Sequence, residues 1–242
     1  MRLAREGLKE MLIATVLLGG GAAAMTWLGW WPVSIPLGAA WLWSLAFFRD
    51  PIRVTHCQPG DLCAPADGTV TEITHLEHDD NLNGPALRVG IFLSIFNVHI
   101  NRSPCAAVVR SVTYKPGRFL DARHPDSGRL NESNMLVLDV AEPNRGPVVV
   151  RQVAGLVARR IICHWRQGDA LEAGERFGLI KFGSRTELIL PDDGAVHVQV
   201  SVGDKVRAGL TILARQLPIP LEKGDDHAGH CQVAPVGPTA TS

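Results

Sequence analysis

The pattern of hydrophobic and polar positions along this 242-residue chain changes near residue 50. Residues 11–31 contain no charged side chain, and a helix of that length spans about 30 Å, enough to cross a bilayer. Pro32 interrupts the run, and residues 33–48 are again uncharged but short for a complete crossing. The pattern therefore predicts an apolar helical hairpin within residues 1–48.

Beyond residue 50 the apolar stretches are short, and clusters of Gly, Pro, Asn and Asp separate them. Examples are Ala86–Ser94, Val108–Thr113, Asn134–Val140 and Val148–Val153. Short apolar runs divided by turn residues are typical of β-strands. We therefore expect residues 49–218 to form one compact, mainly β domain.

A short internal repeat refines this fold prediction. Residues 168–174 and 203–209 share the pattern Gly-Asp-x-apolar-x-Ala-Gly. Each copy predicts a turn, a short strand and a second turn, as in the barrel-sandwich folds of lipoyl-like domains. Two copies are too few for a solenoid. They favour a small β sandwich with two pseudo-symmetric halves.

Basic residues flank the uncharged region on both sides, with Arg2, Arg5 and Lys9 before it and Arg49 and Arg53 after it. This distribution favours a membrane hairpin with both ends in the cytoplasm. A cleaved signal peptide is disfavoured because the apolar region is too long and doubled. A buried hairpin of a soluble protein is the other alternative. We expect a separable anchor, whose removal releases the domain and leaves its chemistry intact.

Composition narrows the class of protein further. The net charge is zero, which argues against a broad nucleic-acid footprint. The cysteines are odd in number and form no Cys-x-x-Cys motif: Cys57, Cys63, Cys105, Cys163 and Cys231. We therefore expect neither a disulfide framework nor a zinc site, and a reducing compartment.

Residues 219–242 lose all periodicity and predict a disordered tail. His227, His230 and Cys231 lie close together there, but a flexible tail offers a metal no fixed geometry, so we expect no metal site.

The candidate chemistry lies at Gly183–Ser184, where two apolar runs flank a Gly-Ser pair. Gly183 can adopt a left-handed backbone because it has no Cβ. Such a backbone would press the Ser184 hydroxyl against the preceding carbonyl group, which is the geometry of self-cleavage at a serine. A bare Gly-Ser pair is more commonly a hairpin turn, so the surrounding sequence decides between the two interpretations.

The sequence Gly-Leu-Ile-Lys-Phe-Gly-Ser-Arg at residues 178–185 resembles the self-processing site of the short bacterial phosphatidylserine decarboxylases. Phe47–Pro51, Ala64–Val70 and Asn97–Pro104 match the same family in the same order. The resemblance implies cleavage between Gly183 and Ser184 into a larger and a smaller chain. Ser184 then becomes a pyruvoyl group, which replaces pyridoxal phosphate as the electron sink of a decarboxylation.

The resemblance also assigns roles to other residues. His99, at the end of an apolar stretch, would be the base, and Asp67 would orient it in a Ser-His-Asp relation with Ser184. Longer family members carry a second histidine near the position of Arg102, so His99 is expected to serve maturation, turnover or both.

Three polar side chains near His99 are candidates for binding the carboxylate or phosphate of a substrate. They are Asn97, Asn101 and Arg102.

The reaction implied by the resemblance is the conversion of phosphatidylserine to phosphatidylethanolamine and CO2 at the bacterial inner membrane, with the catalytic domain facing the cytoplasm. The partners would be membrane lipids and the two chains of one proenzyme, without a metal or nucleic acid. One alternative is a membrane-tethered lipoyl-like adaptor, although the long heptad helices and the carrier lysine of such modules are not evident. A pyruvoyl decarboxylase of a soluble amino acid is another.

Overall fold

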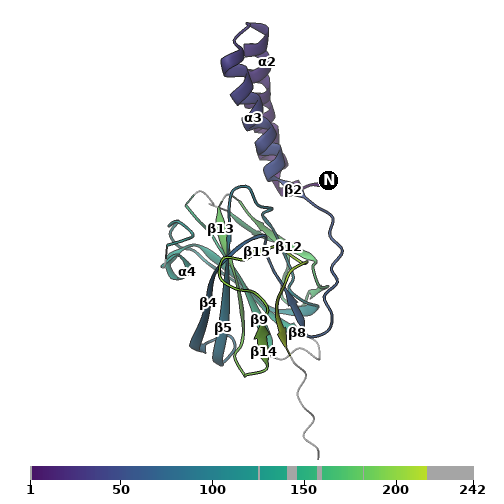
Figure 1. The fold of residues 1–242 in the computed structure, drawn as a ribbon, viewed down its shortest axis with the longest axis vertical. Coiled ribbons are helices and arrows are strands. Elements are labelled where there is room, and N and C mark those ends of the chain that lie inside the picture. The colour runs from purple at the N-terminus through teal and green to yellow at the C-terminus, as the bar shows by residue number, and fades with distance from the viewer. Residues whose placement is uncertain (1, 125, 141–145, 157–159, 182, 217–242) are drawn as a thin grey trace, which may run out of the picture.

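The computed structural model describes residues 2–124, 126–140, 146–156, 160–181 and 183–216. A helical hairpin stands on one end of a β domain (Figure 1). The expected tail, residues 219–242, and its His227, His230 and Cys231 lie outside the described residues.

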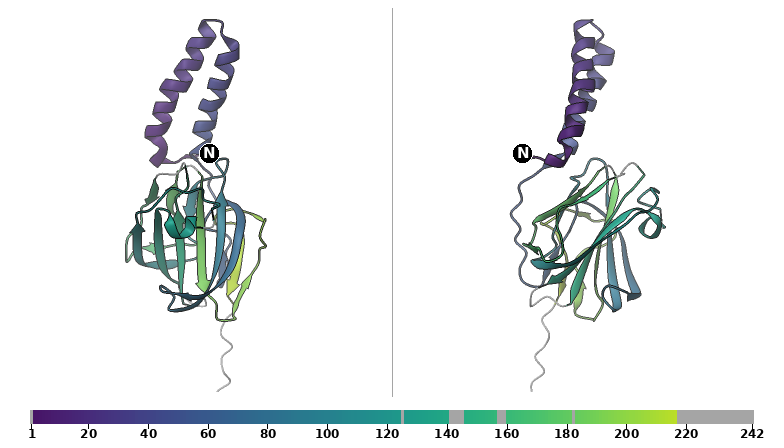
Figure 2. Two further views of the ribbon diagram at one scale, coloured as in Figure 1. Left: turned by 90° about the vertical axis from the view of Figure 1, so that its left-hand side faces the viewer. Right: turned by 180° about the vertical axis from the view of Figure 1, so that it is seen from behind.

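The hairpin consists of two helical arms that run side by side (Figure 2). The first arm contains η1 (Arg5–Gly7), α1 (Leu8–Ala14), the π-helical η2 (Thr15–Gly19) and α2 (Gly20–Trp27), and the second is α3 (Trp31–Phe47). The turn comes earlier than the sequence predicts, at 28–30, where Gly29 has a φ of 75°. Pro32 lies in the first turn of α3, where a missing N–H costs nothing, and so does not interrupt the helix.

The apolar side chains of the hairpin face outward. Val16, Leu17 and Trp27 are all more than 60% exposed. The first arm, Arg5–Trp27, is 23 residues long, which is enough to cross a membrane, whereas Trp31–Phe47 is shorter. A helix that exposes its apolar side chains is consistent with contact with lipid.

The β domain is built on one curled antiparallel sheet of eight strands. In spatial order these are β11 (Ala170–Leu171), β7 (Ala107–Lys115), β8 (Ser133–Val140), β9 (Pro147–Val153), β13 (Ser184–Pro191), β5 (Gly84–Leu93), β4 (Gly68–Asp79) and β15 (Lys205–Val206). Three of the four stretches predicted as strands lie within β7, β8 and β9, and the fourth lies in β5 except for its last residue, Ser94, so the mainly β prediction is confirmed.

Smaller elements complete the domain. One three-stranded sheet contains β10 (Ile161–Cys163), β12 (Arg176–Ile180) and β6 (Ile100–Arg102), and another contains β14 (Val196–Val198), β16 (Ile212–Gln216) and β3 (Asp61–Cys63). A two-stranded pairing of β1 (Arg2–Leu3) with β2 (Arg49–Asp50) joins the two ends of the hairpin, and α4 (Ser127–Leu130) is a short helix beside the large sheet.

The two copies of the internal repeat lie at the two edges of the large sheet. One copy supplies β11 and the other supplies β15, which are the two edge strands. Their final glycines meet, because a Cβ on Gly209 would lie 3.2 Å from the Cα of Gly174. The ends of the two repeats therefore lie close together, where the curled sheet brings its two edges toward each other.

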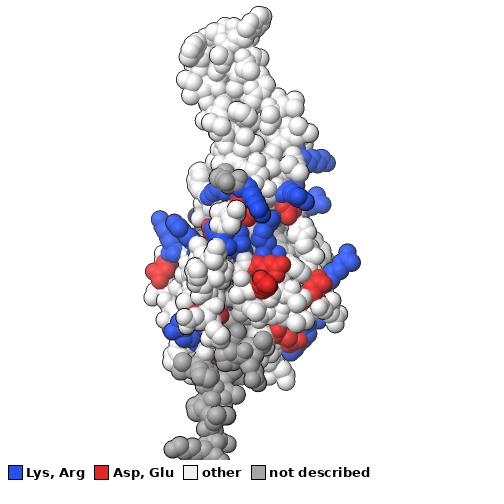
Figure 3. All heavy atoms as spheres, turned by 90° about the vertical axis from the view of Figure 1, so that its right-hand side faces the viewer, with Lys and Arg blue, Asp and Glu red and all other residues white. Residues whose placement is uncertain are grey.

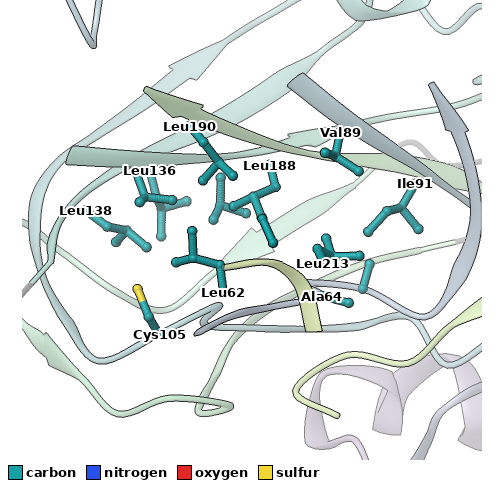
Figure 4. Close-up of a cluster of buried hydrophobic side chains, with 14 of the residues drawn as sticks. Leu62, Ala64, Val89, Ile91, Cys105, Leu136, Leu138, Leu188, Leu190 and Leu213 are labelled. Carbon is teal, nitrogen blue, oxygen red and sulfur yellow. The ribbon is translucent and has the colours of Figure 1, made fainter. Parts of the chain in front are cut away.

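The main hydrophobic core lies between the large sheet and the β14–β16–β3 sheet (Figure 4). Leu188 and Leu190 of β13 and Val89 and Ile91 of β5 point toward Leu213 from the opposite side (Figure 4). Because β13 is central in the sheet and buried along most of its length, the residue at its start is held in a rigid framework.

The expectation of no disulfide is wrong at one place. Cys57 and Cys63 are bonded, with their Cα atoms 6.6 Å apart. Between them Pro59 and Gly60 form a turn, with the Asp61 N–H donating to the Gln58 carbonyl and Gly60 at a φ of 92°. Spacing motifs do not reveal this pair because the turn, rather than a Cys-x-x-Cys motif, brings the thiols together.

Candidate active site

Ser184 is the first residue of β13 and lies opposite Leu93 of β5. It is completely buried, and its hydroxyl oxygen has no hydrogen-bond partner among the described residues. A buried polar group without a partner costs about 1–3 kcal/mol. Gly183, just before it, has a φ of 60°, the left-handed backbone that its lack of a side chain allows. An unpartnered buried hydroxyl next to a left-handed backbone makes the Gly183–Ser184 peptide a candidate reactive site.

His99 lies against this peptide. Its Nδ1 is 3.0 Å from the Asn97 carbonyl oxygen, and the Gly183 N–H donates to its Nε2 at 3.3 Å. A carbonyl only accepts and an amide N–H only donates, so the proton of the neutral ring is assigned to Nδ1. The lone pair on Nε2 therefore faces the backbone next to Ser184.

The surroundings of His99 keep it neutral. Burial, with a smaller contribution from the charge of Arg49, lowers the pKa of this imidazole from 6.5 to about 4, against the opposing effects of the Asn97 carbonyl and Asp67. The ring of Phe47 covers it, with ring centroids 4.3 Å apart. At neutral pH His99 is thus an unprotonated base in an apolar setting.

Gly155 is a site residue that sequence analysis missed. It follows β9, and a Cβ built on it would lie 2.2 Å from the Gly183 carbonyl oxygen. The same Cβ would lie 3.4 Å from the side chain of Ala122, so Gly155 is packed between Ala122 and the Gly183 carbonyl. Only a glycine leaves room for the carbonyl of the candidate scissile bond. No local sequence motif indicates this constraint.

Asp67 is held by groups other than His99. Its two carboxylate oxygens accept from Arg53 at 2.5 and 2.7 Å, and the Ala208 N–H donates to it at 2.8 Å. Its charge still reaches His99 through space. The expected direct hydrogen bond between Asp67 and His99 is absent among the described contacts, and Arg53 is a partner that sequence analysis did not identify.

Asn101 and Arg102 are buried in internal networks. Asn101 donates to Thr186 Oγ1 at 3.1 Å and accepts from Gln152 at 2.8 Å. Arg102 donates to the carbonyl oxygen of Gly174 at 3.0 Å and pairs with Asp50 at 3.2 Å. Both residues belong to β6, the strand directly after His99, and their side-chain contacts fix the position of that strand.

A cavity of about 600 Å³ opens beside Asp67. Asn97 lines it, so this predicted binding residue does face open space. Four basic residues also line it, Arg49, Arg53, Lys205 and Arg207, with Asp67 as the one acidic residue among the lining residues. Because strands lie about 4.8 Å apart, the β4 wall of the cavity lies roughly 10 Å from Ser184, two strands away.

The residues around Ser184 are compatible with a chemical modification of this serine within the folded chain. Ser184 has a hydroxyl without a partner among the described residues, a left-handed glycine before it, and an imidazole whose Nε2 accepts from the Gly183 N–H. A nucleophile and a nearby base of this kind are the groups that self-processing at a Gly-Ser bond would use. Within the described ranges no group of three or more His, Cys, Asp or Glu side chains is placed to hold a metal ion.

Comparisons with known proteins identify the family of this chain. The phosphatidylserine decarboxylase family matches residues 42–214. Three similar proteins are each named phosphatidylserine decarboxylase proenzyme. The one from Rhodopirellula baltica is 43% identical over 87% of both chains. The one from Desulfotalea psychrophila is 44% identical over 71% of this chain and 78% of its own. The one from Nitrobacter winogradskyi is 42% identical over 81% and 80%. With its motifs in order and more than half of its length matched, this chain belongs to the phosphatidylserine decarboxylase family.

Proposed function

We propose that this protein is a self-processing, pyruvoyl-dependent enzyme that converts phosphatidylserine to phosphatidylethanolamine and CO2. Family membership supports the reaction. The observation that carries the proposal is the buried Ser184 hydroxyl, which has no partner among the described residues and follows a left-handed Gly183 whose N–H donates to the neutral His99.

Maturation begins with proton transfer from Ser184 Oγ to a base, for which His99 Nε2 is the candidate. The oxygen attacks the Gly183 carbonyl carbon, an ester bond forms, and the bond from that carbon to the Ser184 nitrogen breaks. Removal of the Ser184 α-proton expels the Gly183 carboxylate and leaves a dehydroalanine. Addition of water and loss of ammonia then give the pyruvoyl group. The contact between the Gly183 N–H and Nε2 puts His99 against this peptide, and the N–H must release the Nε2 lone pair before the ring can accept the Ser184 proton.

In turnover the pyruvoyl group supplies the electron sink for the departing CO2. The cationic cavity beside Asp67 is the candidate site for the anionic headgroup, since Arg49, Lys205 and Arg207 offer positive charge to its phosphodiester. Asn97 can donate to the same group. Asn101 and Arg102 act indirectly, by fixing the strand after His99.

The two chains stay together after cleavage. β13 of the smaller chain is hydrogen-bonded to β5 on one side and β9 on the other, both from the larger chain. β15 pairs with β4 and β16 with β3 in the same way. Dissociation would break these ladders and expose the main core, so a stable heterodimer is the expected product.

The proposed location of the enzyme is the inner membrane, with its catalytic domain in the cytoplasm. The outward apolar side chains support attachment. Lys and Arg side chains gather where the uncharged hairpin meets the domain (Figure 3), as expected at the cytoplasmic surface. The active site then lies close to the headgroups of its substrate.

The function is tested with purified protein in mixed micelles of detergent and phosphatidylserine. Release of CO2 from the serine carboxyl and formation of phosphatidylethanolamine are measured, with free serine as a second substrate and Ser184→Ala as the control. We expect turnover of the lipid and none by the control. Turnover of serine alone would favour a soluble-substrate decarboxylase, and no decarboxylation of either would favour the adaptor alternative.

A further inference from the structure

The base of the hairpin is packed onto the part of the domain that carries the processing site. Ala4, Met11, Phe47 and Phe48 form a buried cluster with Val98, Ile100 and Leu179 of the domain. These last residues lie on either side of His99 and just before Lys181. The hairpin is therefore packed against the catalytic domain through a hydrophobic contact, in addition to its covalent link.

Lys181, two residues before the candidate scissile bond, is held by the first arm of the hairpin. Its ammonium group donates to the Glu6 carbonyl oxygen at 3.1 Å and pairs with Glu10 at 2.5 Å. The Lys181 side chain is 7% exposed and that of Glu10 is 35% exposed. A buried cation fixed at two points restrains the backbone that leads into Gly183.

The second arm contacts the candidate base. Phe47, at the end of α3, stacks on His99, and Arg49, two residues later, donates to the Phe96 carbonyl oxygen at 2.5 Å. These contacts hold the turn before His99 and exclude water from its ring. The two arms thus restrain the two reacting parts separately, one the peptide and the other the imidazole.

We propose that the docked hairpin is part of the processing apparatus, with Glu10, Lys181 and Phe47 as positioning residues, so that the chain cuts itself only when its membrane anchor is seated on the domain. This proposal rests on the proposed self-cleavage at Gly183–Ser184. It replaces the expectation of a separable anchor whose removal leaves the chemistry unchanged. Cleavage would then be linked to correct assembly of the anchor.

The test follows conversion of newly made full-length chains into two chains, by cell-free synthesis with vesicles of phosphatidylethanolamine and phosphatidylglycerol. Since a misplacement of about 1 Å can cost about 10²-fold in rate, we expect Glu10→Ala and Phe47→Ala to cut at least about tenfold more slowly. Lys9→Ala and Leu42→Ala are matched controls, because both side chains are exposed on the same helices.

The pH profile separates positioning from a general loss of stability. Phe47→Ala admits water to His99, so the acid limb of its cleavage rate should move from about pH 4 toward the ordinary value near 6.5, with Arg49 and Asp67 still present. Phe47→Leu, which keeps an apolar cover, should restore most of the rate. Wild-type rates and an unmoved acid limb in Glu10→Ala and Phe47→Ala would overturn the proposal. If instead the wild type itself stays uncut, the proposed function fails first.

Discussion

Replacement of Gly155 by alanine tests whether the Gly183 carbonyl, which belongs to the proposed scissile bond, is positioned as the structure has it. The new Cβ would lie 2.2 Å from the Gly183 oxygen, and Cβ atoms essentially never come closer than 3.0 Å to such an atom, so the two must separate by roughly 0.8 Å. A displacement near 1 Å from a reactive geometry costs about 10²-fold in rate, or about 2.7 kcal/mol of activation free energy. We therefore expect Gly155→Ala to cut itself about 10²-fold more slowly than the wild type.

The assay is a time course of newly synthesised chain, with the uncut and cut forms separated by gel electrophoresis. Gly84→Ala is the matched control, because an added Cβ there meets nothing within 4 Å, and it should cut at the wild-type rate. If Gly155→Ala cuts as fast as Gly84→Ala while hydrogen exchange shows β13 equally protected in both, close packing of Gly155 on the Gly183 carbonyl does not control cleavage.

Three further predictions follow from the same structure. The cleavage rate should stay level from about pH 8 to 5 and fall toward pH 4, because His99, with its lowered pKa, is unprotonated above about pH 4. A cleavage rate that falls as the pH drops through 6.5 would contradict this prediction. Asp67→Asn, in an uncut Ser184→Ala background, should lower the free energy of unfolding by about 3 kcal/mol in urea, because Arg53 loses its buried counter-charge; unchanged stability would argue that Asp67 acts on His99 alone. Washing membranes with 1 M salt should leave the protein attached, since the hold is apolar, and release into the wash would count against an inserted hairpin.

Most of the fold could be predicted from the sequence, because the patterns that indicate its helices and strands involve residues close together in the chain. Uncharged runs predict the hairpin, short apolar stretches predict β5, β7, β8 and β9, and the repeated glycines mark the two edge strands. The turn of the hairpin was misplaced by a few residues, since a proline can begin a helix as well as end one. The Cys57–Cys63 pair was missed because it depends on a turn.

The candidate site was predictable only in part, because its contacts join residues far apart in the chain. The resemblance located Ser184 and His99, which the structure brings together through Gly183. It could not locate Gly155, whose importance is a matter of free space, or the partner of Asp67. The contact of the hairpin with His99 is likewise a product of packing, which no sequence pattern encodes.

The central claim is that the chain cuts itself between Gly183 and Ser184 and carries its own electrophile. An intact-mass spectrum of the purified wild-type protein tests it most directly, with Ser184→Ala beside it. We expect two chains for the wild type, residues 1–183 and 184–242, and one uncut chain for the variant. The smaller wild-type chain should be blocked to Edman sequencing and carry the mass of a pyruvoyl group in place of serine. A single intact chain in active wild-type enzyme, or a smaller chain that begins with an ordinary serine, would contradict it.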